Sequence, residues 1–135
     1  MSHLKYFSYP GWGERANESS HMSQAVRVGD FITISGQGGW NCDSGEISDD
    51  ITTEIEQAFD NVNVALKDAG GKGWCEVFRI NLYMMNITEE SMAGLKRAME
   101  KWMPDHKPVL TGVGVPALAA PGMTCEVEVW AHVQQ

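Results

Sequence analysis

The feature that most constrains this fold is a stripe of apolar residues between Asp50 and Gly71. The residues recur mainly at intervals of three and four, as they do on one side of an α-helix. They are Ile51, Ile55, Ala58, Phe59, Val62, Ala65, Leu66 and Ala69. Asp50 is suited to cap the start of the helix, and Gly70-Gly71 can supply the left-handed residue that ends it. The sequence therefore predicts an amphipathic helix over this range.

A second helix is predicted from residue 89 to about residue 103. Asn86 and Thr88 are the candidate caps at its start, and Pro104 follows its end. The residues expected to face inward are Met92, Leu95, Ala98, Met99 and Trp102. Methionine and tryptophan at this spacing are more often packing residues than parts of a cofactor site, so no cofactor is expected.

Strands are predicted at residues 25–28, 31–35, 75–85, 110–115 and 123–133. In the last of these, one face is apolar and the other carries Glu126, Glu128 and Trp130. Because two helices cover only one face of such a sheet, the second face must meet solvent, a ligand or another subunit. The pattern predicts an α+β fold and favours self-association.

The composition, 43% hydrophobic and 21% charged, suits one globular domain over residues 1–135. Residues 1–21 show neither a helical nor a strand period, so an ordered N-terminal loop region is expected there. The net charge of -8 argues against nucleic acid and anionic membranes as partners. Three cysteines without C-x-x-C spacing fit a reducing compartment. With no signal peptide or long apolar run, a cytoplasmic location is expected.

The turn Gly36-Gln37-Gly38-Gly39 follows a strand, as a phosphate-binding loop does, but it lacks the Gly-Lys-Ser/Thr ending. A ligand-lining turn or a plain strand-end turn is the better interpretation. Ser35 belongs to no G-x-S-x-G elbow and has no evident base, which favours a hydrogen-bonding role. Cys42 has no histidine near it in sequence, so a loop cysteine is expected rather than a nucleophile.

The four histidines lack the spacing of metal ligands, so no metal site is expected. His21 precedes the strand at 25–28 and can face the turn after Ser35. Glu126 and Glu128 project the same way, about 6 to 7 Å apart, which suits acid/base work or a wet interface. Cys75 and Cys125 are expected to be buried apolar side chains in strands.

An ordered set of segments resembles the Rid/YjgF family of reactive intermediate deaminases, also known as L-PSP endoribonucleases. The segments are Ser23-Gln24-Ala25-Val26, Val28-Gly29-Asp30-Phe31-Ile32, Ile34-Ser35-Gly36-Gln37, Leu66-Lys67-Asp68-Ala69-Gly70 and Cys125-Glu126-Val127-Glu128-Val129-Trp130-Ala131. The match runs from about residue 22 to residue 133. It implies a chorismate-mutase-like α+β fold with a mixed sheet, two helices on one face, and a homotrimer with ligand clefts between subunits.

The resemblance also implies hydrolysis of small reactive imines and enamines to ammonia and 2-oxo acids, without a cofactor. In active members an arginine near the start of the penultimate strand binds the substrate carboxylate. Leu110 stands at that position here, and leucine cannot bind a carboxylate. The chain also has Met22 where the family has a tyrosine and Gly112 where it often has a cysteine.

Glu126 matches the family's acidic position. The resemblance implies that Glu126 and the backbone carbonyl of Gly112 position a water molecule, while Glu126 passes protons to the imine nitrogen. The residues implied to line the substrate cleft are Met22, Ser35, Gly36, Trp40 and Leu110.

The leading hypothesis is a Rid-like hydrolase or deaminase that acts on a small imine or enamine lacking the usual carboxylate. The alternative is a non-catalytic homologue that binds a small apolar metabolite. Endoribonuclease activity conflicts with the charge of -8 and with the absence of a basic groove. The substrate stays open, as does the question whether Arg15, Arg27 or Arg79 replaces the missing arginine.

Overall fold

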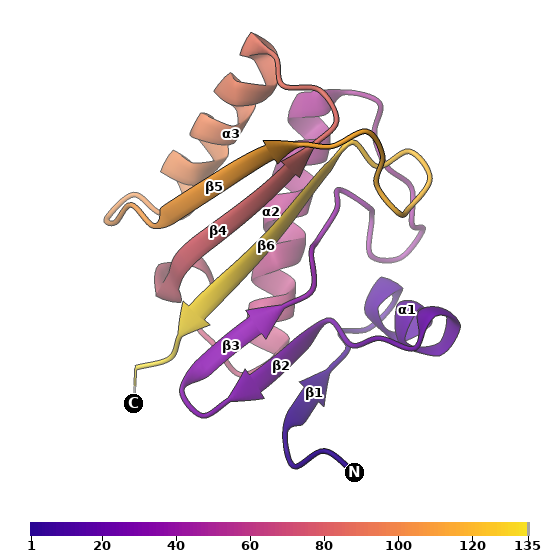
Figure 1. Ribbon diagram of the computed structural model, residues 1–135, viewed down its shortest axis with the longest axis vertical. Helices are drawn as coiled ribbons and strands as arrows, with labels where there is room; N and C mark the ends of the chain where they lie inside the picture. Colours follow the sequence, from indigo (N-terminus) through magenta and orange to yellow (C-terminus); the bar gives the residue numbers. More distant parts are fainter. Residues whose placement is uncertain (135) are drawn as a thin grey trace.

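The computed structural model describes residues 1–134, which form a six-stranded mixed sheet with two helices packed on one face (Figure 1). The strands are β1 (Lys5–Phe7), β2 (Ala25–Val28), β3 (Phe31–Ile34), β4 (Val77–Met84), β5 (Val109–Gly114) and β6 (Cys125–His132). The helices are α1 (Trp12–Ser20), α2 (Ile51–Asp68) and α3 (Glu89–Trp102), with a short 3-10 turn, η1 (Trp74–Glu76), before β4. The predicted α+β fold is confirmed.

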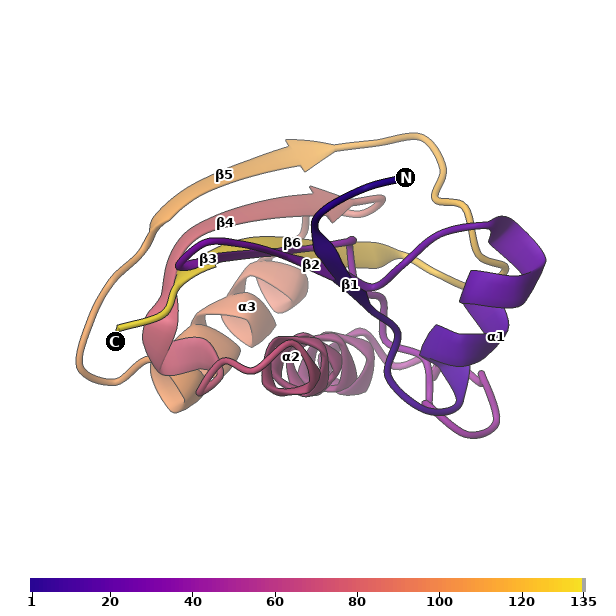
Figure 2. The same ribbon diagram turned by 90° about the horizontal axis from the view of Figure 1, so that it is seen from below.

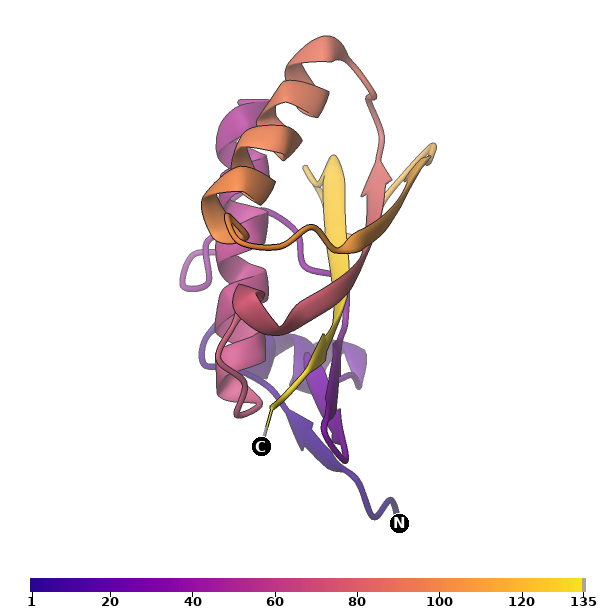
Figure 3. The same cartoon turned by 90° about the vertical axis from the view of Figure 1, so that its left-hand side faces the viewer.

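The last strand of the chain lies in the interior of the sheet. The strand order is β1-β2-β3-β6-β4-β5, so β6 separates β3 from β4. Only the β4–β5 pair is parallel among these neighbours. Seen along the sheet, α2 and α3 lie on the same side of it, and no helix of residues 1–134 lies over the opposite side (Figure 2, Figure 3). One face of the sheet is therefore left for other contacts.

The core lies between α2 and the apolar face of β6. Ile55, Phe59 and Leu66 of α2 are fully buried, as are Val127 and Val129 of β6. The Phe59 ring stacks on Trp74 with 4.7 Å between ring centroids, and the Trp74 indole N–H donates to the Phe59 carbonyl oxygen at 2.9 Å. Burial of each large apolar side chain contributes about 1.5 to 3 kcal/mol, so this layer stabilises both the helix and the centre of the sheet.

The ends of both long helices follow their sequence signals. The Asp50 carboxylate accepts from the Thr53 backbone N–H at 3.0 Å, and Gly70 has a φ of 89° just beyond the end of α2. At the start of α3, Thr88 and Ser91 form a reciprocal capping box. Both predicted helices are confirmed, but Met92 is 52% exposed instead of facing inward.

The expectation of a loop throughout residues 1–21 is wrong. This segment contains β1, which pairs with β2, and α1. Because α1 is short and largely polar, with Gly13 its only buried residue, it lacks the apolar stripe by which the other helices were predicted. Its position depends instead on tertiary hydrogen bonds, beginning with the Trp12 N–H, which donates to the Cys42 carbonyl oxygen at 2.7 Å.

Two further expectations need correction. Residues 75 and 76 belong to η1 and not to a strand, and Cys75 is exposed, whereas Cys125 is buried in β6 as expected. The predicted strands otherwise overlap β2 to β6, and their ends differ by at most two residues. Among residues 1–134, no helix combines the length and apolar character needed to span a membrane.

Candidate functional site

Glu126 lies beside the turn that follows β3. A methyl group at Gly36 would overlap the Glu126 carboxylate, so only glycine leaves room for this side chain position. The turn itself is tied to β6 through two backbone hydrogen bonds between Gln37 and Val127, at 2.8 and 2.9 Å. Sheet pairing thus sets both the glycine and the carboxylate in one place.

Buried polar side chains hold the rest of this turn. The Gln37 amide N–H donates to the Gln24 side-chain oxygen at 2.8 Å, and the Tyr9 hydroxyl donates to the Gln37 side-chain oxygen at 2.7 Å. The Trp40 indole N–H in turn donates to the Tyr9 oxygen at 3.1 Å. Burial raises the pKa of Tyr9, so its phenol stays neutral and keeps donating to Gln37. The network fixes the orientation of Trp40.

A second anchor comes from α2. The amide of Asn61 donates to the carbonyl oxygens of Gly38 and Trp40, both at 2.8 Å. The buried Glu54 carboxylate accepts from the backbone N–H groups of Thr124 and Cys125 at 2.7 and 3.1 Å, and also from the Thr124 hydroxyl. Glu54 therefore holds the segment that leads directly into Glu126.

These elements enclose a cavity of about 480 Å³, a size that suits a small metabolite. Its walls come from α1, the segment 22–24, the turn after β3, the loop before β6, and β6 itself. The lining residues are Trp12, Arg15, Ala16, Ser19, Ser20, Met22, Gln24, Gly36, Trp40, Ala119, Ala120, Pro121, Met123 and Glu126. Trp12 stacks on Trp40 with 4.3 Å between ring centroids, which makes one wall flat and apolar.

The electrostatics distinguish Glu126 from its neighbour. Burial and, second, the charge of Glu128 raise the pKa of the Glu126 carboxyl. Glu128 is already engaged, because its carboxylate accepts from the Tyr83 hydroxyl at 2.5 Å and from the Asn81 amide at 3.1 Å. Within residues 1–134, the Glu126 carboxylate has no hydrogen-bond partner. Glu126 is therefore free to exchange a proton with a ligand in the cavity.

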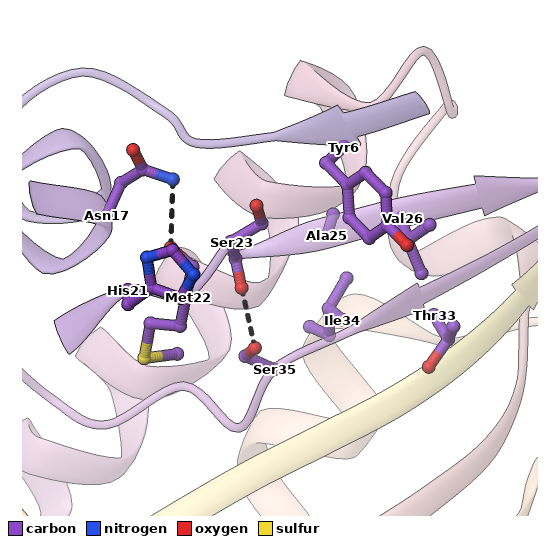
Figure 4. Close-up of a pocket in the computed structure, with 10 residues that line it drawn as sticks. All are labelled: Tyr6, Asn17, His21, Met22, Ser23, Ala25, Val26, Thr33, Ile34 and Ser35. Atoms are coloured by element: carbon purple, nitrogen blue, oxygen red, sulfur yellow. Dashed lines mark hydrogen bonds between the residues drawn. The ribbon is translucent and has the colours of Figure 1, made fainter. Parts of the chain in front are cut away.

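Ser35 lines a neighbouring pocket of about 610 Å³, drawn in Figure 4. Met22 lines both this pocket and the cavity that contains Glu126. The Ser35 hydroxyl donates to the Ser23 carbonyl oxygen at 2.8 Å, which agrees with the predicted hydrogen-bonding role. His21 lies beside Met22 in the same view, and it lines this pocket together with Ser35, as the sequence suggested.

Leu110 and Gly112 lie elsewhere in the chain. Both are on β5, which β4 separates from β6. Leu110 pairs with the buried Ile80 and lines a different cavity, of about 590 Å³, between β5 and α3. A single chain therefore brings together Met22, Gly36, Trp40 and Glu126, with Ser35 next to them, but not Leu110 or Gly112.

Among the three arginines considered from the sequence, only Arg15 lines the Glu126 cavity. Arg27 instead donates to the carbonyl oxygens of Gly29 and Ala69. Arg79 donates to the Thr111 hydroxyl at 3.3 Å. The sequence offers Arg15 as a candidate but does not place it, because nothing in residues 12–20 predicts a helix. Among the described residues, no cluster of three histidine, cysteine or acidic side chains is arranged to hold a metal ion.

Comparison with known proteins agrees with this geometry. A family model described as Endoribonuclease L-PSP matches residues 14–133. The chain belongs to the Rid/YjgF family. A 2-iminobutanoate/2-iminopropanoate deaminase from Dermatophagoides farinae is 30% identical to this Rid-family chain over 97 residues, covering 71% of the chain and 73% of the relative. A RutC family protein from Aquifex aeolicus is 32% identical over 109 residues, covering 79% and 82%.

A solved structure shows the same fold at appreciable sequence identity. RidA from an Antarctic Psychrobacter species has a TM-score of 0.75 and 28% identity, and the alignment covers 83% of the Rid-family chain and 88% of RidA. The Rid/YjgF family predicted from the sequence is therefore confirmed. The α+β fold of that family is confirmed by the same comparison.

Proposed function

We propose that this protein hydrolyses a small imine or enamine, and that Glu126 is the catalytic acid/base. The observation that carries the proposal is the state of the Glu126 carboxyl. It lines a cavity, its pKa is raised, and it has no hydrogen-bond partner within residues 1–134. A relative named as a 2-iminobutanoate/2-iminopropanoate deaminase supports this class of reaction.

The reaction requires one water molecule and one proton-transfer group. Glu126 donates a proton to the imine nitrogen and then accepts one from a water molecule as the water oxygen bonds to the imine carbon. Glu126 then returns this proton to the carbinolamine nitrogen. The C–N bond breaks to release ammonia, and the Glu126 carboxylate accepts the hydroxyl proton, which leaves the carbonyl product. An enamine is first protonated on carbon to reach the same imine. A raised pKa suits this role because the carboxyl then keeps its proton at a higher pH than an ordinary carboxyl does, as a general acid requires.

We further propose a homotrimer with ligand clefts between its subunits. Leu110 and Gly112 lie on β5, away from Glu126, so only another copy of the chain can bring them to that carboxylate. The face without helices also exposes apolar side chains that suit burial: Phe31 and Phe78 are 48% and 41% exposed, and Val109 and Val113 are 58% and 42% exposed. In such a cleft, the Gly112 carbonyl oxygen would help to hold the water. Analytical ultracentrifugation tests the stoichiometry.

Leu110 leaves two kinds of substrate open. The simpler is an imine that lacks the usual carboxylate, because the leucine offers no donor. The other is an imine whose carboxylate is bound by a different element. A non-catalytic homologue that binds a small apolar metabolite is the second candidate function, and Leu110 is the residue that favours it. RNA cleavage is not proposed, because a charge of -8 opposes RNA binding. A cytoplasmic location remains a prediction.

The test is release of carbonyl product from imines generated in situ, with neutral and carboxylate-bearing examples compared. Glu126→Gln is expected to lower kcat by at least about 100-fold, the usual size of a general acid/base contribution. Glu56→Gln is the matched control, because Glu56 is exposed on α2 and loses the same charge. Equal turnover by wild type and Glu126→Gln would remove Glu126 from the mechanism. Thermal stabilisation by imines without formation of any product would instead support the non-catalytic homologue that binds a small metabolite.

A further inference from the structure

We infer that Arg15, on α1, binds the carboxylate of the substrate in the Glu126 cavity and thereby takes over the role that Leu110 cannot fill. The choice of an imine as the ligand rests on the proposed function, whereas the place of Arg15 in the cavity does not depend on it. The observation is that a guanidinium from the N-terminal helix and the free Glu126 carboxylate line the same cavity.

The Arg15 side chain is held in place from one side. Its Nη2 donates to the carbonyl oxygens of Cys42 and Asp43, at 3.2 and 2.9 Å. The start of α1 is attached to the same loop, because the Trp12 N–H also donates to the Cys42 carbonyl oxygen. An exposed arginine normally loses considerable side-chain entropy on binding a ligand, and these contacts reduce that loss in advance.

The rest of the guanidinium remains available. Arginine has five N–H donors, and the two carbonyl oxygens engage only those on Nη2. In the described part of the chain, Nε and Nη1 of Arg15 have no hydrogen-bond or ion-pair partner. A planar carboxylate matches two parallel N–H groups of this kind better than any neutral ligand does.

Arg15 and Glu126 do not neutralise each other in the cavity. No ion pair joins the two side chains in residues 1–134, although both line one cavity. A small ligand with a carboxylate and an imine nitrogen can therefore hydrogen-bond to both groups, with about 2.8 Å for each charge-assisted bond.

The walls of the cavity define the rest of the ligand. The same cavity is lined by the stacked rings of Trp12 and Trp40 and by the side chain of Met123. The ligand class is therefore an imine with a small apolar body and one carboxylate. The carboxylate is directed toward α1 and the nitrogen toward Glu126.

The experiment compares Arg15→Gln with wild type on two imines of similar size, one neutral and one with a carboxylate. We expect kcat/KM for the carboxylate imine to fall at least about tenfold, mainly through KM, because a charge-assisted pair is lost. Turnover of the neutral imine is expected to fall much less than turnover of the carboxylate imine, and far-UV circular dichroism shows that the variant is folded. Arg97→Gln, which removes an exposed arginine on α3, is the matched control.

A binding measurement separates this inference from the proposed reaction. Pyruvate, the simplest 2-oxo acid, is titrated calorimetrically into wild type, Arg15→Gln and Arg15→Lys. At least about tenfold weaker binding to Arg15→Gln supports the inference even if no imine is hydrolysed, and the lysine variant should restore binding in part because it keeps the charge without the fork. Unchanged pyruvate affinity and unchanged KM in Arg15→Gln would overturn the inference while leaving hydrolysis by Glu126 intact.

Discussion

Replacing Glu54 with alanine is expected to lower the free energy of unfolding by about 3 to 7 kcal/mol. Glu54 is 2% exposed, and its carboxylate accepts from two backbone N–H groups, those of Thr124 and Cys125, and from the Thr124 hydroxyl. Alanine leaves both N–H groups without this acceptor, at about 1 to 3 kcal/mol each, whereas the hydroxyl can rotate to another partner. The lost Cγ methylene group adds roughly 1 kcal/mol.

Two milder variants set the scale of this effect. Glu54→Gln keeps one oxygen but turns an NH₂ group toward a backbone N–H, so we expect a loss of about 2 to 3 kcal/mol. Thr124→Val removes only the hydroxyl contact with Glu54 and should cost about 1 kcal/mol. We expect the loss of stability to be largest for Glu54→Ala, smaller for Glu54→Gln and smallest for Thr124→Val. This order tests the reasoning as well as the individual values do.

The assay is urea unfolding at one fixed protein concentration, since self-association would make the midpoint depend on concentration. The slope of the unfolding free energy against urea concentration should be the same in all variants, so that a shift of the midpoint reports the change in stability. A loss below about 1 kcal/mol for Glu54→Ala would refute the reasoning, because it would mean that the two N–H groups find other partners at little cost. The natural stability of domains this size is about 5 to 15 kcal/mol, so the expected loss is readily measured.

Three further predictions concern the cavity. Gly36→Ala should displace the Glu126 carboxylate and reduce imine turnover at least about tenfold, while circular dichroism shows that the protein stays folded. The control is Gly114→Ala, whose added methyl group would make only ordinary van der Waals contacts. Because the pKa of Glu126 is raised in the folded protein, the native state binds its proton more tightly than the unfolded chain does, and stability should fall as the pH rises from the ordinary carboxyl pKa through the raised one. In urea titrations at several pH values, the stability of Glu126→Gln should lack this pH dependence. Identical pH profiles of stability for wild type and Glu126→Gln would contradict the prediction. Trp12→Ala removes the ring stacked on Trp40 and should cost about 2 kcal/mol of stability, and a loss under about 0.5 kcal/mol would show that the stack is not stabilising.

Elements with a strong internal pattern were predictable from the sequence. The apolar stripe of α2 and its Asp50 cap needed no knowledge of the rest of the chain, and the alternation along β6 assigned Glu126 to the uncovered face. The helix α1 was missed for the opposite reason. Its place depends on hydrogen bonds to the loop at Cys42, about thirty residues away, and not on a periodicity of its own.

The candidate site divides in the same way. The resemblance to the Rid family implied that Gly36 lines the cleft in which Glu126 acts. The structure brings the two residues together because β3 and β6 are neighbours. Arg15 could be named but not placed, because its contribution required the fold of α1. Leu110 was grouped with Glu126 by family position, and within one chain the order of the strands separates them.

The position of β6 has a consequence for how the chain reaches its native state. The strands β1 to β3 and the pair β4–β5 are joined in the sheet only through β6, which comes last in the sequence. Until residues 125–132 have been synthesised and inserted, the two groups of strands have no edge in common, and the apolar face of α2 lacks its central partner. Contacts between such distant parts of a chain are slow to form, because a long loop must close first. Loss of this strand should therefore do more than shorten the sheet, because it would divide the sheet into two unconnected halves.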